Sequence, residues 1–320
     1  CFDALCIGEG EKPTQELVSQ LEKGISPSGI AGLWIKHQGG IEKNPTSSFL
    51  QDLDSLPFPD REIWKQQTEE KTESPYVILL GRGCPFNCSY CCNHKLRNIA
   101  PGPYVRLRSP DNIIEEITQL SKNSSGIKKI LLEVETIDID RNWTMELCSK
   151  LEQLRSRAEK PLSYETNLRI TPNRDFESLF IALKKANFEI IHIGLESGSE
   201  RIRSSILKRD YANRDIINAV KLAKKYGLKV LLFNMIGLPT ETLDDFEETV
   251  KINRICLPDA NNTSIFFPYQ GTDLHLLCKK MGLLKNINLD EIVERKQAVF
   301  GLKGFSKEQI ELAYKFFNFF

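Results

Sequence analysis

The strongest constraint on the fold is an alternation that begins at residue 76. Short runs rich in β-branched and aromatic residues alternate from there with stretches whose apolar residues recur at helical spacing. This alternation is typical of βα units and predicts an α/β fold around a parallel sheet. The expected strands are YVILLG (76–81), KKILLE (128–133), LSYETN (162–167), EIIHIGL (189–195), LKVLLFNMIG (228–237) and TSIFFP (263–268).

A polar segment follows each expected strand. In parallel sheets of this kind, the loops after the C-terminal strand ends carry the chemistry. The unusual polar residues are therefore predicted to lie on one rim of the sheet. In chain order the segments are GRGCPFNCSYCC, EVET, NLR, ESGSE, GLPTE and PYQGT.

The first 75 residues do not follow this pattern. They hold one expected strand (FDALCIG), one helix (PTQELVSQLEKG), a hairpin around GLWIKHQGGIEKN, and a linker, LDSLPFPDREIW, whose prolines interrupt regular structure. We interpret this segment, too small for a domain, as the last strand and helix of an upstream α/β domain and its tether. The chain begins with Cys1 and ends in KFFNFF, so we expect a fragment of a longer protein.

Composition disfavours several classes of protein. The 320 residues are 41% hydrophobic, which suffices for a full core. Lysine plus arginine and aspartate plus glutamate both total 43, so no net field would attract nucleic acid. No apolar run approaches the roughly 18 residues of a membrane span, and the N-terminus lacks the basic start of a signal peptide. We expect a cytoplasmic protein with no nucleic-acid partner and no membrane span.

Four of the nine cysteines lie within CPFNCSYCC. Cys84, Cys88 and Cys91 form C-x3-C-x2-C directly after the first expected strand. Three thiolates on so short a loop can hold three corners of a [4Fe-4S] cluster and leave the fourth iron open. Two alternatives remain: a zinc site completed by Cys92 or His94, although no second cysteine pair follows, and a redox pair that leaves Cys84 unexplained.

The stretch GRGCPFNCSYCCN resembles the cluster loop of the radical S-adenosylmethionine (SAM) enzymes. IHIGLESGSERIRSSILKRDY, GLKVLLFNMIGLPTET and SIFFPYQGT resemble the subgroup with an N-terminal cobalamin (B12)-binding domain, and DALCIGEGEKPTQELV through LDSLPFPDREIW resembles the end of that domain. This resemblance implies a partial (β/α)6 TIM-like barrel, the radical SAM core, preceded by the remnant of an α/β cobalamin-binding domain. The expected divisions are 1–60 for the remnant and linker, 61–270 for the barrel, and 271–320 for an incomplete helical extension.

The resemblance implies an oxygen-sensitive enzyme that cleaves SAM reductively at a [4Fe-4S] cluster to a 5'-deoxyadenosyl radical. Cys84, Cys88 and Cys91 would ligate the cluster, and a low-potential flavodoxin or ferredoxin would reduce it. The expected reaction is cobalamin-associated methyl transfer, or radical cyclisation or oxidation, on a small-molecule or lipid-like organic substrate. Cobalamin itself would require the full-length protein, because its cobalt-ligating motif would lie upstream of Cys1.

Two other functions remain as alternatives. A methylthiotransferase would share the barrel, but the chain shows no second cysteine trio and no obvious RNA-binding module. A non-catalytic zinc-binding or interaction protein on the same barrel would use the cysteines structurally, although such a protein has no use for the polar rim.

The resemblance also implies contacts to the methionine part of SAM. Glu133 or Glu135 would receive its amino group. Asn167, Arg169 and Arg209 are candidates for holding its carboxylate, a task that suits the planar guanidinium of arginine. The rival interpretation is that the two glutamates and the arginines are solvated surface charges.

Further contacts are implied for the nucleoside part of SAM. Glu196, which directly follows an apolar strand, would accept hydrogen bonds from the ribose hydroxyls. Tyr90 would pack on the adenine or the cluster, and Asn234 and Gly237 would lie beside the adenine. His192, within the strand, is interpreted as a satisfied interior histidine.

Overall fold

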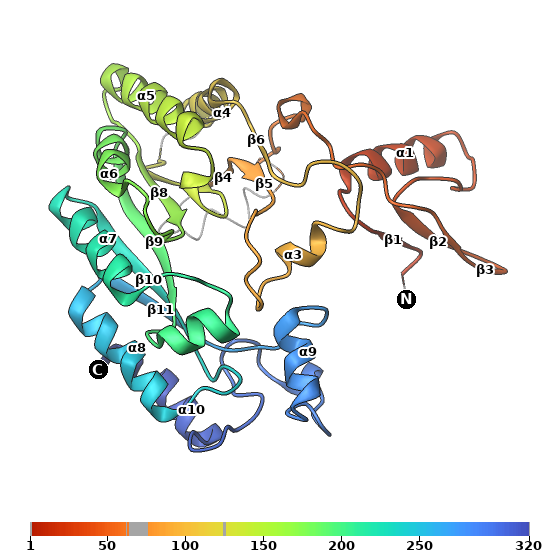
Figure 1. The fold of residues 1–320 in the computed structure, drawn as a ribbon. Helices are drawn as coiled ribbons and strands as arrows, with labels where there is room; N and C mark the ends of the chain where they lie inside the picture. Colours follow the sequence, from red (N-terminus) through yellow and green to blue (C-terminus); the bar gives the residue numbers. More distant parts are fainter. Residues whose placement is uncertain (1, 62, 64–75, 124–125, 320) are drawn as a thin grey trace.

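The computed structural model describes residues 2–61, 63, 76–123 and 126–319 (Figure 1). Within these residues the largest sheet has the strand order β11-β10-β9-β8-β7-β4, and every pairing in it is parallel. The predicted α/β fold with a parallel sheet is therefore confirmed. The strands are β4 (Tyr76–Leu79), β7 (Lys129–Glu133), β8 (Ser163–Leu168), β9 (Phe188–Glu196), β10 (Lys229–Ile236) and β11 (Ala260–Ile265).

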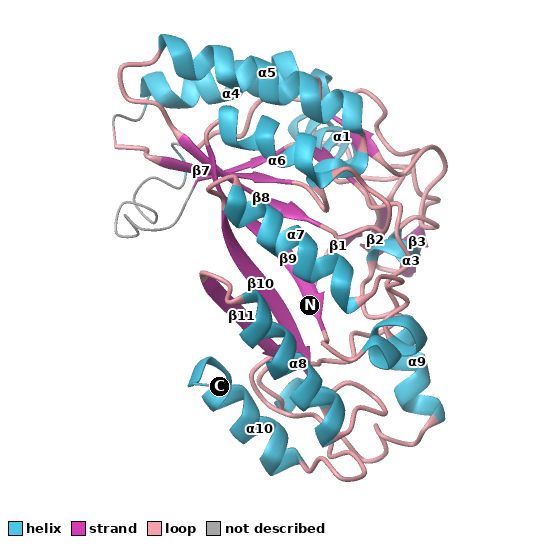
Figure 2. Cartoon of the chain, turned by 60° about the vertical axis from the view of Figure 1, so that its left-hand side comes forward, coloured by secondary structure: helices cyan, strands magenta, loops and turns pink. Residues whose placement is uncertain are grey.

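An arc of helices covers the outer face of this sheet (Figures 1 and 2). Consecutive helices of the arc contact each other. Side chains cap two of their N-termini where the chain leaves the rim: Asp140 accepts from the N–H of Trp143, and Asp175 accepts from the N–H of Ser178. The helices are α4 (Pro110–Asn123), α5 (Arg141–Arg157), α6 (Phe176–Lys185), α7 (Asn213–Lys225) and α8 (Leu243–Cys256).

The core lies between the sheet and these helices. Because strand side chains alternate, one set from each of β4, β7, β8, β9 and β10 points outward and is buried, and Ile78, Ile130 and Ile191 are fully buried. The alternate residues of β4, Val77 and Leu79, are exposed. Among the described residues, the face of β4 that points away from these helices is therefore accessible, and the polar rim lies at the carboxyl end of the sheet.

Shorter elements surround the rim. Three short elements lie near the cysteine loop: the ribbon of β5 (Gly81–Arg82) and β6 (Arg106–Leu107), the helix α3 (Asn93–Leu96) and the short helix η4 (Ile202–Ile206). The C-terminal part adds α9 (Asp273–Lys280) and α10 (Lys307–Phe316), and α10 packs against β11. The remaining short helices of the described residues are η1 (Leu53–Ser55), η3 (Ile137–Ile139), η5 (Leu289–Glu291) and η6 (Phe317–Phe319).

The N-terminal segment forms a small unit of its own. It consists of β1 (Ala4–Cys6), α1 (Glu11–Glu22), β2 (Leu33–His37) and β3 (Gly40–Lys43), and its antiparallel sheet has the order β1-β2-β3. The predicted strand, helix and hairpin are thus present. Its buried apolar cluster contains Ile30, Leu33 and Ile35, which is little for a unit that must be stable alone.

One strand prediction was wrong in position. The last strand was expected at 263–268, but β11 spans Ala260–Ile265. Asn261 and Asn262 are poor strand formers by themselves, yet they pair with Leu232 and Phe233 of β10. Pairing with the neighbouring strand, rather than local propensity, thus sets the start of β11.

No helix in the described part of the chain is long and apolar enough to cross a lipid bilayer.

Candidate active site

The cysteine loop follows β5 at the carboxyl end of the sheet. Cys84 and Cys88 are buried, Cys91 is half-buried, and Cys92 is exposed, all as free thiols. The three cysteines of the C-x3-C-x2-C pattern therefore lie inside the rim, and the fourth does not. Arg97 holds the start of the loop in shape, because its guanidinium donates to the carbonyl of Cys84 at 2.8 Å and to that of Phe86 at 3.2 Å.

Two glycines allow β6 to approach the beginning of this loop closely. A Cβ atom on Gly83 would lie 2.2 Å from the carbonyl oxygen of Tyr104, and Gly83 has a φ of +86°. A Cβ atom on Gly81 would lie 2.5 Å from the carbonyl oxygen of Arg106. Both contacts are to backbone, so neither can be relieved by a side-chain rotation. The GRG sequence thus lets the ribbon support the first cysteine.

Distant segments fix the second half of the loop. Ser89 is buried, and its N–H donates to the carbonyl of Leu207 at 3.2 Å, while its own carbonyl accepts from the N–H of Leu274 at 3.0 Å. Asp273, the first residue of α9, pairs with Lys95 at 2.9 Å and with Lys208 at 2.6 Å. The cysteine loop is therefore held between η4 and α9.

The thiols lie beside a cationic side chain. Arg169 donates through Nη1 to Sγ of Cys88 at 2.7 Å, and its guanidinium stacks over Phe86 at 4.1 Å. Burial raises the pKa of Cys84 to about 11, and the nearby Glu135 carboxylate adds to this shift. Burial likewise raises the pKa of Cys91. Bound cations would offset this penalty on the thiolates. Among the described residues no three side chains are arranged to hold a single metal ion. Three cysteines on one short loop next to a guanidinium are nevertheless the number and type of ligands that an iron–sulfur cluster takes.

The two rim glutamates at the end of β7 and just beyond it are each held by an asparagine amide. Asn167 donates to Oε1 of Glu133 at 2.8 Å, and Asn93 donates to Oε1 of Glu135 at 2.9 Å. Burial raises the pKa of Glu133. The hydrogen bond from Asn167 acts against this rise in pKa, and the negative charge of Glu135 adds to it. Glu135 is therefore tied to the cysteine loop, whereas Glu133 is tied to β8.

A second polar group lies at the end of β9. Glu196 has a φ of +62°, a left-handed backbone conformation that non-glycine residues adopt in only about a few per cent of cases. Its Oε1 accepts from the hydroxyl of Tyr90 at 3.0 Å and from Arg209 at 3.2 Å. Arg209 is buried and donates also to the Tyr90 hydroxyl at 2.9 Å and to the carbonyl of Gly194 at 2.7 Å. Arg209 is therefore not a surface charge, and its donors already hold Glu196 and Tyr90.

Two predicted residues lie away from these groups. The side chain of Asn234 faces the helices, where it accepts from the side chain of Asn253 in α8 at 2.9 Å. Gly237 donates its N–H to Glu241 at 2.5 Å. A Cβ atom added at Gly237 would lie 3.1 Å from Cγ2 of Ile310 in α10. Their contact with an adenine stays a prediction, and for Asn234 it applies to the main chain alone.

His192 and several residues that the sequence reasoning passed over also have clear positions. Nε2 of His192 lies 3.1 Å from Oε2 of Glu165, as expected for a satisfied interior histidine. Asn93 and Tyr104 lie in the site but were missed. Asn93 directly follows the paired cysteines, a position that could have suggested a role, whereas no local signal marks Tyr104.

Comparisons with known proteins agree with this geometry. Residues 78–252 match the family described as the radical SAM superfamily. An uncharacterised methyltransferase from Pyrococcus horikoshii is 31% identical over 97% of this chain and 65% of its own length. The anaerobic magnesium-protoporphyrin IX monomethyl ester cyclase of Rubrivivax gelatinosus is 27% identical over 85% of this chain and 48% of its own length. The chain thus spans about half to two thirds of the length of these relatives.

A solved structure shares the fold. The radical SAM methyltransferase TsrM from Kitasatospora setae, determined with cobalamin and a [4Fe-4S] cluster bound, aligns with a TM-score of 0.68 at 18% identity. The alignment covers 87% of this chain and 56% of that one. At this identity the likeness concerns the fold.

Proposed function

Because the chain belongs to the radical SAM superfamily, whose members use a [4Fe-4S] cluster and SAM, we propose that Cys84, Cys88 and Cys91 hold the cluster and leave one iron open to SAM. The observation that carries this proposal is the arrangement of the three thiols on one rim loop, with Arg169 donating to Cys88. When bound and reduced, the cluster supplies the electron for cleavage of SAM.

The rim residues divide the task of holding SAM. Arg169 is the candidate for its carboxylate, since it is half-buried and lies against a proposed cluster ligand. Glu135 is the candidate for its amino group, because its partner Asn93 belongs to the cysteine loop. Both described contacts of Glu196 go to Oε1, which leaves Oε2 to accept from a ribose hydroxyl. Arg209 and Tyr90 keep that carboxylate in place.

Cobalamin-associated methyl transfer to a small organic substrate is the reaction we favour. It is supported by the relative that is named as a methyltransferase and by the fold shared with a cobalamin-bound one. Radical cyclisation or oxidation is a second candidate, supported by the ester cyclase relative. A low-potential flavodoxin or ferredoxin would reduce the cluster in either case.

Anaerobic reconstitution tests the cluster assignment. We expect about four iron and four sulfide per chain in the unmodified protein and in Cys92→Ser, whose side chain is exposed, but a loss of both in Cys91→Ser. The reduced, loaded protein should release 5'-deoxyadenosine from SAM. Binding of one zinc without iron, or no release from a fully loaded protein, would contradict the proposal.

A labelled-methyl experiment separates the two candidate reactions. The full-length protein, loaded with cluster and with hydroxocobalamin that has been reduced to cob(I)alamin, would be given SAM carrying a labelled methyl group. Transfer of the label to cobalamin supports methyl transfer, while release of 5'-deoxyadenosine without any labelling of cobalamin favours cyclisation or oxidation.

A further inference from the structure

The side chain of Asn93 connects a proposed cluster ligand to a proposed SAM ligand. Asn93 is the first residue of α3, and its Nδ2 donates to Oε1 of Glu135 at 2.9 Å and to Sγ of Cys91 at 3.5 Å. Its Oδ1 accepts from the hydroxyl of Tyr104 at 2.6 Å. One amide thus joins three polar groups from three parts of the chain.

The chemistry of these groups fixes the orientation of the amide. An ionised carboxylate can only accept hydrogen bonds, so the amide nitrogen must face Glu135 and not the oxygen. The oxygen is then left for Tyr104, whose hydroxyl can donate. A flipped amide would set two acceptors against each other at Glu135, so the arrangement has one satisfied form.

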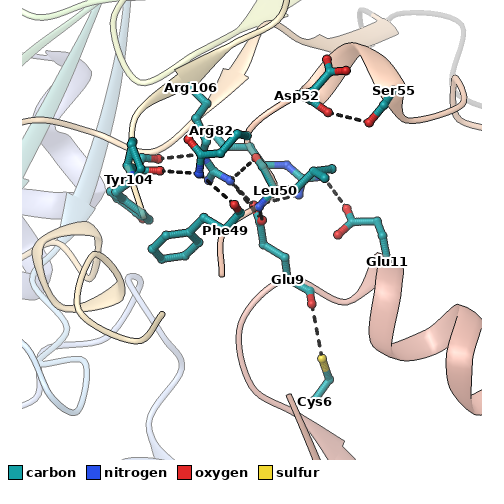
Figure 3. A network of polar contacts seen from close by, with 12 residues as sticks. Cys6, Glu9, Glu11, Phe49, Leu50, Asp52, Ser55, Arg82, Tyr104 and Arg106 are labelled. Carbon is teal, nitrogen blue, oxygen red and sulfur yellow. Dashed lines mark hydrogen bonds and ion pairs between the residues drawn. The ribbon is translucent and has the colours of Figure 1, made fainter. Parts of the chain in front are cut away.

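Tyr104 is itself held firmly. Its ring packs against Phe49 with centroids 5.2 Å apart, and its carbonyl accepts from Nε of Arg106 at 3.1 Å. Arg106 is in turn bound by the carboxylate of Glu9 at 2.9 and 3.0 Å (Figure 3). Contacts with β6 and with the N-terminal segment therefore hold Tyr104, whose hydroxyl orients Asn93, in its position.

We propose that Asn93 is a positioning residue for both cofactors, and this inference rests on the proposed function. Its Nδ2 donates to Sγ of Cys91, which would be a thiolate in the cluster-bound protein, and hydrogen bonds to cluster sulfurs set the reduction potential. The same group holds the Glu135 carboxylate in the direction of the cysteine loop, as partners of ligating side chains commonly do. Tyr104 keeps the amide in this orientation.

The test compares three variants of the anaerobically reconstituted protein. Asn93→Asp keeps the size of the side chain but replaces the donor with an acceptor. Tyr104→Phe removes only the hydroxyl that orients the amide. Asn98→Asp is the matched control, because Asn98 is exposed on the adjoining turn and the substitution makes the same change in charge. Iron and sulfide are measured first for each protein.

Two readouts besides activity decide the outcome. The midpoint potential of the cluster, measured without SAM, should fall in Asn93→Asp and, to a smaller extent, in Tyr104→Phe. The dissociation constant for SAM should rise about tenfold in Asn93→Asp, as expected for the loss of one hydrogen bond to a charged group. Asn98→Asp should change neither by a comparable amount.

The possible failures are distinguishable. If the unmodified protein assembles a cluster and binds SAM, but Asn93→Asp and Tyr104→Phe match Asn98→Asp in both readouts, the role of Asn93 is overturned and the proposed function stands. If the unmodified protein assembles no cluster, the proposed function and this inference fall together. If only Asn93→Asp loses the cluster, the two readouts of Tyr104→Phe decide the outcome. Tyr104→Phe retains every proposed ligand of the cluster and of SAM.

Discussion

The carboxyl group of Glu241 is buried in the turn after β10. It accepts from the N–H groups of Gly237 at 2.5 Å and of Leu238 at 3.0 Å. Burial raises its pKa from 4.5 to about 8, against the effect of these two hydrogen bonds. The folded protein therefore retains a proton over a pH range in which the unfolded chain releases it, and its stability should fall as the pH rises through that range.

Glu241→Gln should remove this pH dependence. The amide oxygen can still accept from the two N–H groups, but the side chain no longer ionises. In the unmodified protein the free energy of unfolding should decline between pH 5 and pH 8, by at most about 1.4 kcal/mol per pH unit from this group. Urea unfolding at several pH values measures the slope. The exposed Glu247→Gln is the control, and an equal slope in Glu241→Gln would refute the expectation.

Arg169→Lys should weaken SAM binding with little effect on stability. Lysine keeps the positive charge but loses the planar fork that matches a carboxylate. We expect the dissociation constant for SAM to rise by roughly tenfold or more, as measured by equilibrium binding to the reconstituted protein. Arg157→Lys, on the exposed end of α5, should leave it unchanged. If Arg169→Lys bound SAM with unchanged affinity, Arg169 would not be the residue that holds the carboxylate of SAM.

At the scale of elements, the close approach of the segments that flank β5 and β6 depends on the absence of a side chain at Gly83. Gly83→Ala would place a Cβ atom against the Tyr104 carbonyl and strain a positive φ. We expect a loss of at least about 2 kcal/mol in the free energy of unfolding and reduced iron incorporation. Gly39→Ala is the control, because no atom lies within 4 Å of its added Cβ and its φ is not positive.

The sequence predicted the elements well where the pattern is local. The strands β4, β7, β8, β9 and β10 and the helical stretches that alternate with them follow from hydrophobic periodicity, and the three cysteines from their spacing. The ribbon of β5 and β6 was not predicted. The pairing of β11 and the contacts of Asn93 could not be predicted this way. Tyr104 and Glu135 are 11 and 42 residues from Asn93 in the chain, and such contacts depend on how the loops pack. The contact between Arg209 and Glu196 could not be predicted either, because it too depends on how the loops pack.

At the scale of the whole molecule, Glu9 joins the N-terminal unit to the barrel (Figure 3). Its carboxylate accepts from Arg82 at 2.9 Å and from the N–H of Leu50 at 2.7 Å, in addition to Arg106. These bonds and charges lower the pKa of Glu9 despite its partial burial. The stability that Glu9 contributes should therefore be present above its usual pKa of 4.5 and be lost as the pH falls through the lowered value.

Glu9→Gln should loosen this junction. The substitution leaves the buried guanidinium of Arg106 without its anionic partner, and we expect a loss of about 2–3 kcal/mol. Chemical denaturation measures the loss, and hydrogen exchange should show faster exchange in residues 45–55. Glu16→Gln, on the exposed side of α1, is the control. Unchanged stability and exchange in Glu9→Gln would show that other contacts hold the two parts together.

The contacts of Ser89 have a consequence for the biosynthesis of the protein. The loop that carries Cys88 and Cys91 rests on Leu207 and Leu274, so its final surroundings are incomplete until α9 has left the ribosome. At translation rates of 5–20 residues per second, this delay is roughly 10–40 s. The thiols lack these supporting contacts during this interval, and we expect iron and sulfide to enter the proposed cluster site only after α9 has been synthesised.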